Sequence, residues 1–207
     1  MHFAFSALTA ITQRHKCGEF TVLNDVATVL YGLVKPLEEL RYLVSPESAE
    51  STIYTILEAH GVGRHYAEVL ERIREQGLVA VSTIFYPLLV IEVASKPLER
   101  ELLSNSRLVR LEEYTLCIPR LEHLIVKLIS TRLYPYTLYG YTLFFTWLSS
   151  RRLDVELLGK LLGISGVSVE EFIREVEEVF KHLQLFRPHE LDESLLEYFK
   201  SLISSVK

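Results

Sequence analysis

The chain contains few residues of several types that usually indicate a particular chemistry. It has only two cysteines, Cys17 and Cys117, and no CxxC spacing. Its apolar beginning, HFAFSALTAI, lacks the basic stretch of a secretory leader and is interpreted as an amphipathic helix. Two isolated cysteines in such a chain predict reduced thiols and a cytoplasmic protein.

Sequence motifs that define common enzyme sites are also missing. The seven histidines show no metal-ligand spacing, and neither a glycine-rich phosphate loop nor a GxSxG or HExxH motif occurs. The chain is therefore not expected to be a P-loop protein, a serine hydrolase of the GxSxG type or a HExxH metalloprotease.

Charge and composition limit the classes of partner that the chain is expected to bind. The net charge of -5 and the pI near 5.8 argue against a general basic surface for nucleic acid. Asparagine, glutamine and methionine are scarce, which indicates a thermophilic source.

The uncharged stretch 133–150 is too interrupted by Pro, Gly, Thr and Ser for a membrane span, so no membrane association is expected. Its aromatic residues, among them Tyr139, Phe144 and Trp147, predict either a core or a surface for a protein partner or a second copy.

Hydrophobic periodicity predicts an α/β (α+β) domain at 1–118 and a helical domain packed on it at 119–207. Strands are expected at 20–23, 39–44, 79–86, 88–93 and 114–118, and helices at 45–61, 64–76 and 96–103. After Pro119 the pattern is helical, with helices expected at 119–132, 136–149, 154–163, 168–185 and 192–205.

One stretch, FTVLNDVATVLYGLVKPLEELRYLV at 20–44, is the most informative. It combines an apolar strand, the polar pair Asn24-Asp25, a short helix and a second strand that carries Glu39 and Arg41. This order resembles the opening of the nucleotidyltransferase superfamily, the fold of DNA polymerase β and of small toxin–antitoxin nucleotidyltransferases. The resemblance implies a mixed sheet with flanking helices, followed by a helical bundle.

Two later segments extend the resemblance to roughly residues 5–165. The segment LVIEVASKPLERELL is similar to the family's third core strand and places Glu92 at its third carboxylate position. The segment CIPRLEHLIVKL is similar to a recurring family segment, which Glu122, Leu124 and Ile125 match.

The resemblance implies nucleotidyl transfer, and it also implies that a residue needed for this reaction has been replaced. Family members transfer a nucleoside monophosphate from a nucleoside triphosphate, and two or three carboxylates hold the Mg²⁺ ions. Alternate strand residues share a face, so the first carboxylate pair corresponds to Glu39 and Arg41. Glu39 keeps an acid, whereas Arg41 places a permanent cation at a metal-ligand position. We expect Arg41 to form an ion pair with Glu92, and also with Glu39; the alternative is an Arg41 that points to solvent.

The nucleotide-binding positions depart from the family as well. The family's Gly-Gly or Gly-Ser turn is Asn24-Asp25 here, which would crowd a triphosphate, although both residues are also ordinary helix caps. The family's Arg-x-Thr loop becomes Lys35-Pro36-Leu37. Lys127 corresponds either to a family lysine that faces the cleft or to a surface lysine.

These departures predict a nucleotidyltransferase-fold protein that has lost nucleotidyl transfer and binds a partner or a nucleotide. The alternative is an active Mg²⁺-dependent enzyme that uses Glu39 and Glu92 to move a nucleoside monophosphate to a protein, an RNA or a small molecule. Mg²⁺ and a nucleoside triphosphate are expected as cofactors only in that second case.

Overall fold

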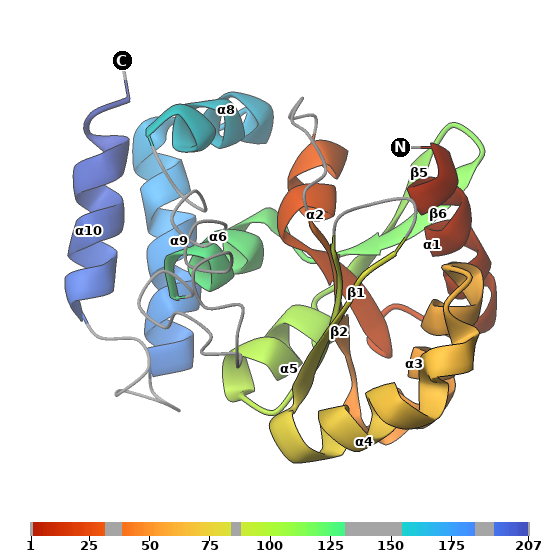
Figure 1. The fold of residues 1–207 in the computed structure, drawn as a ribbon. Coiled ribbons are helices and arrows are strands. Elements are labelled where there is room, and N and C mark those ends of the chain that lie inside the picture. Colours follow the sequence, from red (N-terminus) through yellow and green to blue (C-terminus); the bar gives the residue numbers. More distant parts are fainter. Residues whose placement is uncertain (1, 32–38, 84–87, 131–154, 185–192, 207) are drawn as a thin grey trace. The chain divides into compact units, whose positions relative to one another are not determined.

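The computed structural model describes residues 2–31, 39–83, 88–130, 155–184 and 193–206 (Figure 1). It divides the chain into two compact units, Met1–Arg120 and Leu121–Lys207. The described helices are α1 (His2–Arg14), α2 (Asn24–Leu30), α3 (Ala49–Ala59), α4 (Tyr66–Gln76), α5 (Pro97–Ser104), α6 (Leu121–Ser130), α8 (Val155–Ser165), α9 (Val169–Gln184) and α10 (Glu193–Ile203), with short 3-10 helices at Pro46–Ser48 and Gly63–His65. The strands are β1 (Phe20–Leu23), β2 (Glu39–Val44), β3 (Leu78–Val81), β4 (Leu88–Val93), β5 (Arg107–Leu111) and β6 (Tyr114–Ile118).

The first unit is built on a four-stranded mixed sheet in the order β1-β2-β4-β3. The central strands β2 and β4 run parallel, and β1 and β3 pair with them antiparallel at the two edges. All six residues of β2 and five of the six residues of β4 are buried, and these include the charged residues Glu39, Arg41 and Glu92 among otherwise mostly apolar side chains. The predicted α/β class is confirmed.

Side chains of successive β2 residues point to opposite faces of this sheet. On one face, Tyr42 contacts His60 at the end of α3. On the other face lies Arg41, and there the Thr21 hydroxyl donates a hydrogen bond of 3.3 Å to the carbonyl of Cys117 in β6. Helix α3 therefore packs on the Tyr42 face of the sheet, and strand β6 packs against the edge strand β1 on the Arg41 face.

The strand predictions at 20–23, 39–44, 88–93 and 114–118 are confirmed, and two details differ. The strand expected at 79–86 is β3, which ends at Val81, because Ser82 and Thr83 are outside the ladder with β4. Strand β5 was not predicted, since four of its five residues are exposed and it has no buried apolar face to give a periodic signal.

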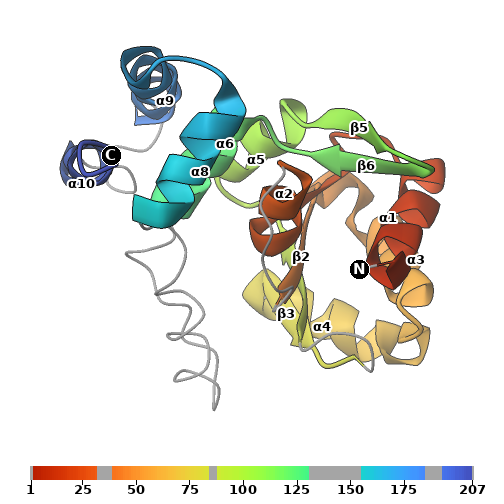
Figure 2. The same ribbon diagram turned by 90° about the horizontal axis from the view of Figure 1, so that it is seen from above.

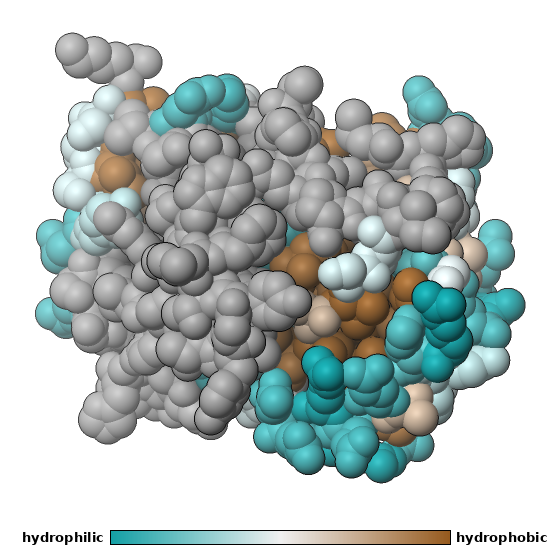
Figure 3. Space-filling view, viewed as in Figure 1, coloured by the Kyte–Doolittle hydropathy of each residue, from teal (hydrophilic) through white to brown (hydrophobic). Residues whose placement is uncertain are grey.

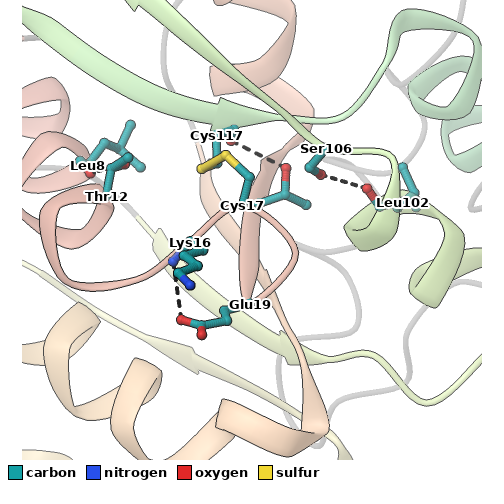
Figure 4. Close-up of a disulfide and its surroundings, with 9 residues drawn as sticks. Leu8, Thr12, Lys16, Cys17, Glu19, Leu102, Ser106 and Cys117 are labelled. Atoms are coloured by element: carbon teal, nitrogen blue, oxygen red, sulfur yellow. Dashed lines mark hydrogen bonds between the residues drawn. A yellow bond between two sulfur atoms is a disulfide. The ribbon is translucent and has the colours of Figure 1, made fainter.

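The two cysteines form a disulfide that links residues 100 positions apart (Figure 4). Cys17 lies in the loop between α1 and β1, and Cys117 lies in β6, with 5.4 Å between their Cα atoms. The prediction of two reduced thiols is wrong. The disulfide forms because of the tertiary fold: helix α1 packs against β6, so the loop after α1 meets that strand.

The described elements of the second unit are all helices (Figure 2). Helix α9 buries Phe172, Val176 and Phe180 along one face, and the Phe172 ring lies 6.4 Å from that of Phe199 in α10. Helix α9 has an N-terminal cap, since the Ser168 hydroxyl accepts a 3.2 Å hydrogen bond from the N–H of Glu171. Among the described residues, no helix is long and apolar enough to cross a membrane.

The surface of the first unit is hydrophilic where its helices meet solvent. Figure 3 shows hydrophilic residues over α4, at the lower right of the view, with apolar residues visible above them. Helix α4 turns Val69 and Ile73 inward and leaves its charged residues outside. This arrangement is the amphipathic pattern that its sequence predicts.

The buried Tyr42–His60 pair makes the stability of the first unit depend on pH. The Tyr42 hydroxyl and Nε2 of His60 are hydrogen-bonded over 2.6 Å, and burial lowers the pKa of His60 to about 3. The unfolded chain therefore takes up a proton on His60 between about pH 6.5 and pH 3 that the folded chain does not bind. The stability that depends on neutral His60 is complete above pH 6.5 and is lost as the pH falls.

The variant His60→Gln should reduce this acid sensitivity. Between pH 6 and pH 4, the slope of unfolding free energy against pH should fall by about one proton, or about 1.4 kcal/mol per pH unit. Urea unfolding across this range measures the slope. The matched variant Tyr42→Phe should lose stability but keep the slope, because His60 stays buried; an unchanged slope in His60→Gln would contradict the assignment.

Candidate functional site

The candidate site lies on the face of the sheet opposite the Tyr42–His60 pair. Glu39 and Arg41 are two residues apart in β2, so both side chains are on the same face. In the parallel ladder, Arg41 is opposite Val90 of β4, and Glu92 is the next β4 residue on that face. The register of β2 and β4 therefore brings Glu39, Arg41 and Glu92 together, as the sequence predicted.

Arg41 joins the two carboxylates through hydrogen-bonded ion pairs. Its Nε and Nη2 atoms donate to the two oxygens of Glu39 over 2.6 and 3.0 Å, a bidentate arrangement. Its Nη1 donates to Oε2 of Glu92 over 3.2 Å. Only 1% of Arg41 is exposed, against 4% of Glu39 and 5% of Glu92. The predicted ion pair is confirmed, and the alternative of a solvent-facing Arg41 is wrong.

The turn before α2 adds two polar side chains to the same cluster. Nδ2 of Asn24 donates a 2.8 Å hydrogen bond to Oε1 of Glu39, and Oδ2 of Asp25 accepts one of 3.0 Å from the backbone N–H of Glu39. Helix α2 follows Leu23 as its N-cap residue and has no side-chain cap. The alternative of ordinary helix caps is therefore wrong: both side chains are used to hold the first residue of β2.

Asn24 also has an unusual backbone. Its φ angle is 52°, in the left-handed region that residues with a Cβ seldom adopt, although asparagine tolerates it better than most. A glycine would adopt this angle without strain. The turn thus has a backbone conformation that favours glycine, and the Asn24 side chain is used for its hydrogen bond to Glu39.

The residues of this cluster do not fit a magnesium site. Mg²⁺ binds oxygen ligands in nearly octahedral geometry, usually with one or two carboxylates. Here both Glu39 oxygens accept hydrogen bonds from Arg41, and the guanidinium lies between the carboxylates of Glu39 and Glu92. Nor do the described residues contain any group of three or more His, Cys, Asp or Glu that could hold a metal ion.

The remaining predicted site residues are Lys35, Lys127 and the aromatic residues of the stretch 133–150. Lys35 and its loop, and the aromatic residues Tyr139, Phe144 and Trp147, lie outside the described residues. Lys127 lies on α6 in the second unit and is only 3% exposed, which contradicts the surface-lysine alternative. Its assignment to a nucleotide cleft stays a prediction.

Comparisons with known proteins assign no family to the chain. No protein-family model matches it, and no curated protein matches it significantly. The candidate site therefore rests on its own geometry.

Proposed function

We propose that this chain is a nucleotidyltransferase-like protein that has lost nucleotidyl transfer and acts by binding a protein partner or a nucleotide. One observation carries the proposal: the Arg41 guanidinium is bonded to both carboxylates at the positions where the family holds its metal ions.

The electrostatics of the cluster support this proposal. Metal-dependent transfer needs carboxylates whose charge is available to a divalent cation. An arginine keeps its positive charge at all accessible pH values, so deprotonation cannot remove the charge that Arg41 places between the two carboxylates. Leaving the cluster would also strand the buried carboxylates of Glu39 and Glu92, which is strongly unfavourable.

The turn at Asn24 and Asp25 supports it independently. A triphosphate at such a turn is bound through backbone N–H groups that it must approach closely. Here the Asn24 and Asp25 side chains occupy the turn, and Asp25 adds a carboxylate that repels phosphate. Nucleotide binding would therefore have to use groups other than these two side chains, and Lys35 and Lys127 are the candidates that the sequence offers.

A thermophilic source would make the proposed cytoplasmic location compatible with the disulfide. Disulfides are rare in the cytosol of mesophiles, whereas intracellular proteins of hyperthermophiles are rich in them. The scarcity of asparagine, glutamine and methionine agrees with such a source.

The proposal is tested by nucleotide transfer and nucleotide binding. We expect no labelled nucleoside monophosphate to be transferred from ATP, GTP, CTP or UTP, with Mg²⁺ or Mn²⁺, to the protein or to added RNA. Calorimetric titration of the same four nucleotides should show no binding that depends on Mg²⁺. Transfer that Glu39→Gln and Glu92→Gln abolish would contradict the proposal and favour the active enzyme with a repositioned metal.

A further inference from the structure

The two cysteines of the Cys17–Cys117 disulfide differ in their access to solvent. Cys17 is partly exposed, in the loop between α1 and β1 that also carries the exposed Lys16 (Figure 4). Cys117 is fully buried in β6. A thiolate opens a disulfide by attacking one of its sulfurs, at a rate that depends on access to that sulfur. An external thiol is therefore expected to attack the sulfur of Cys17.

Contacts other than the disulfide hold the loop that carries Cys17. Oε2 of Glu19 lies 3.2 Å from Nδ1 of His15, and Nε2 of His15 is hydrogen-bonded to the Thr55 hydroxyl of α3 over 3.0 Å. The carbonyl of Glu19 accepts a 2.8 Å hydrogen bond from the N–H of Ser45, which follows β2. None of these contacts involves a sulfur, so they remain available to hold the loop after the disulfide is opened.

The β5–β6 hairpin carries the other cysteine and has less support of its own. Strand β5 pairs with β6 alone among the described strands, and four of its five residues are exposed. Strand β6 is hydrogen-bonded to α1 from the N–H of Thr115 to Oγ1 of Thr9 over 3.1 Å, and to β1 through Thr21. A two-stranded sheet is at best marginally stable by itself. The disulfide adds a covalent link between this hairpin and the loop before β1.

We propose that the Cys17–Cys117 disulfide is a redox switch, which a protein dithiol opens at Cys17 in the folded chain, so that the β5–β6 hairpin opens more often while the central sheet stays closed. This inference goes beyond the proposed function and does not depend on the loss of nucleotidyl transfer. The fold places the two Cα atoms 5.4 Å apart through contacts on both sides of the bond. The reverse exchange with the oxidised form of the same dithiol therefore re-forms the disulfide.

The exchange takes two steps. A thiolate of the reductant bonds to Sγ of Cys17 and the Cys17–Cys117 bond breaks, so Cys117 leaves as a thiolate and takes up a proton. The second thiolate of the reductant then attacks the reductant's own sulfur in the mixed disulfide and releases Cys17, which also takes up a proton. The chain gains two electrons and two protons, and the reductant, a protein with a CxxC dithiol, becomes a disulfide.

Reduction of the oxidised full-length chain by a CxxC oxidoreductase, in buffer without denaturant, tests the exchange. The rate should rise in proportion to the oxidoreductase concentration, because the bond is opened without global unfolding. Acid quenching of the reaction with a CxxS variant of the oxidoreductase should trap a mixed disulfide that mass spectrometry locates at Cys17. A chain that is reduced only in denaturant, or a mixed disulfide at Cys117, overturns the proposal.

Hydrogen exchange of the oxidised and reduced chains tests the effect on the hairpin. On reduction, exchange in residues 107–118 should rise at least about tenfold more than exchange in β2 and β4, because the hairpin opens locally. The double variant Cys17→Ser/Cys117→Ser should match the reduced wild type, and the reductant should not change its exchange. An equal increase in all three segments would mean that the bond stabilises the unit uniformly and is no switch, and unchanged exchange in the hairpin would overturn the proposal as well.

Discussion

Replacement of Arg41 by methionine is expected to lower the free energy of unfolding of the first unit by about 3–5 kcal/mol. Methionine is unbranched and flexible, so it can fill much of the space of the arginine stem without supplying a charge. The loss leaves Glu39 and Glu92, both at least 95% buried, without the guanidinium that joins them. Thermal or urea unfolding, followed by circular dichroism, measures the effect.

A triple variant separates stranded charge from lost volume. Arg41→Met combined with Glu39→Gln and Glu92→Gln removes the carboxylate charges that the single substitution leaves uncompensated. It should recover more than half of the lost stability, since replacing a whole buried ionic group is far less harmful than removing one partner. A single variant as stable as the wild type, or a triple variant less stable than the single one, would contradict the role assigned to Arg41.

Reduction of the disulfide is the second change with a large expected effect. The Cys17–Cys117 bond closes a loop of 100 residues within the first unit. Such a bond stabilises mainly by restricting the unfolded chain, and its loss is expected to remove about 2–4 kcal/mol. The melting transition of the first unit should fall by about 10 °C in the presence of a reductant. Differential scanning calorimetry with and without a phosphine reductant measures the shift.

The double variant Cys17→Ser/Cys117→Ser is the matched control for this experiment. It should melt at the temperature of the reduced wild type, and the reductant should have no effect on it. Titration of thiols in the untreated, denatured wild type should find none. Two free thiols in that titration, or a melting temperature that reduction does not change, would show that the bond does not form.

Much of the first unit could be predicted from the sequence because its central strands are buried on both faces. The mostly apolar segments at 39–44 and 88–93 form β2 and β4 with the expected bounds. The Arg41 ion pair was predictable for a related reason: two-residue spacing in β2 places Glu39 and Arg41 on one face, and the proposed family order placed Glu92 nearby.

The remaining features depend on contacts that no local pattern encodes. The disulfide joins residues 100 positions apart, and only the packing of α1 on β6 brings them together. The roles of Asn24 and Asp25 depend on where β2 begins relative to the turn, because their partner is its first residue, Glu39. As isolated residues before a helix, they were indistinguishable from ordinary caps.

We propose that the Arg41 guanidinium occupies the position at which nucleotidyltransferases bind their metal ions. Titration of the wild-type protein with Mn²⁺, followed by electron paramagnetic resonance, tests this claim most directly, with Glu92→Gln measured in parallel. The account predicts that the wild type and Glu92→Gln show the same weak, nonspecific binding. A wild-type Mn²⁺ site that Glu92→Gln abolishes would contradict it, because the carboxylates would then be available to metal despite Arg41.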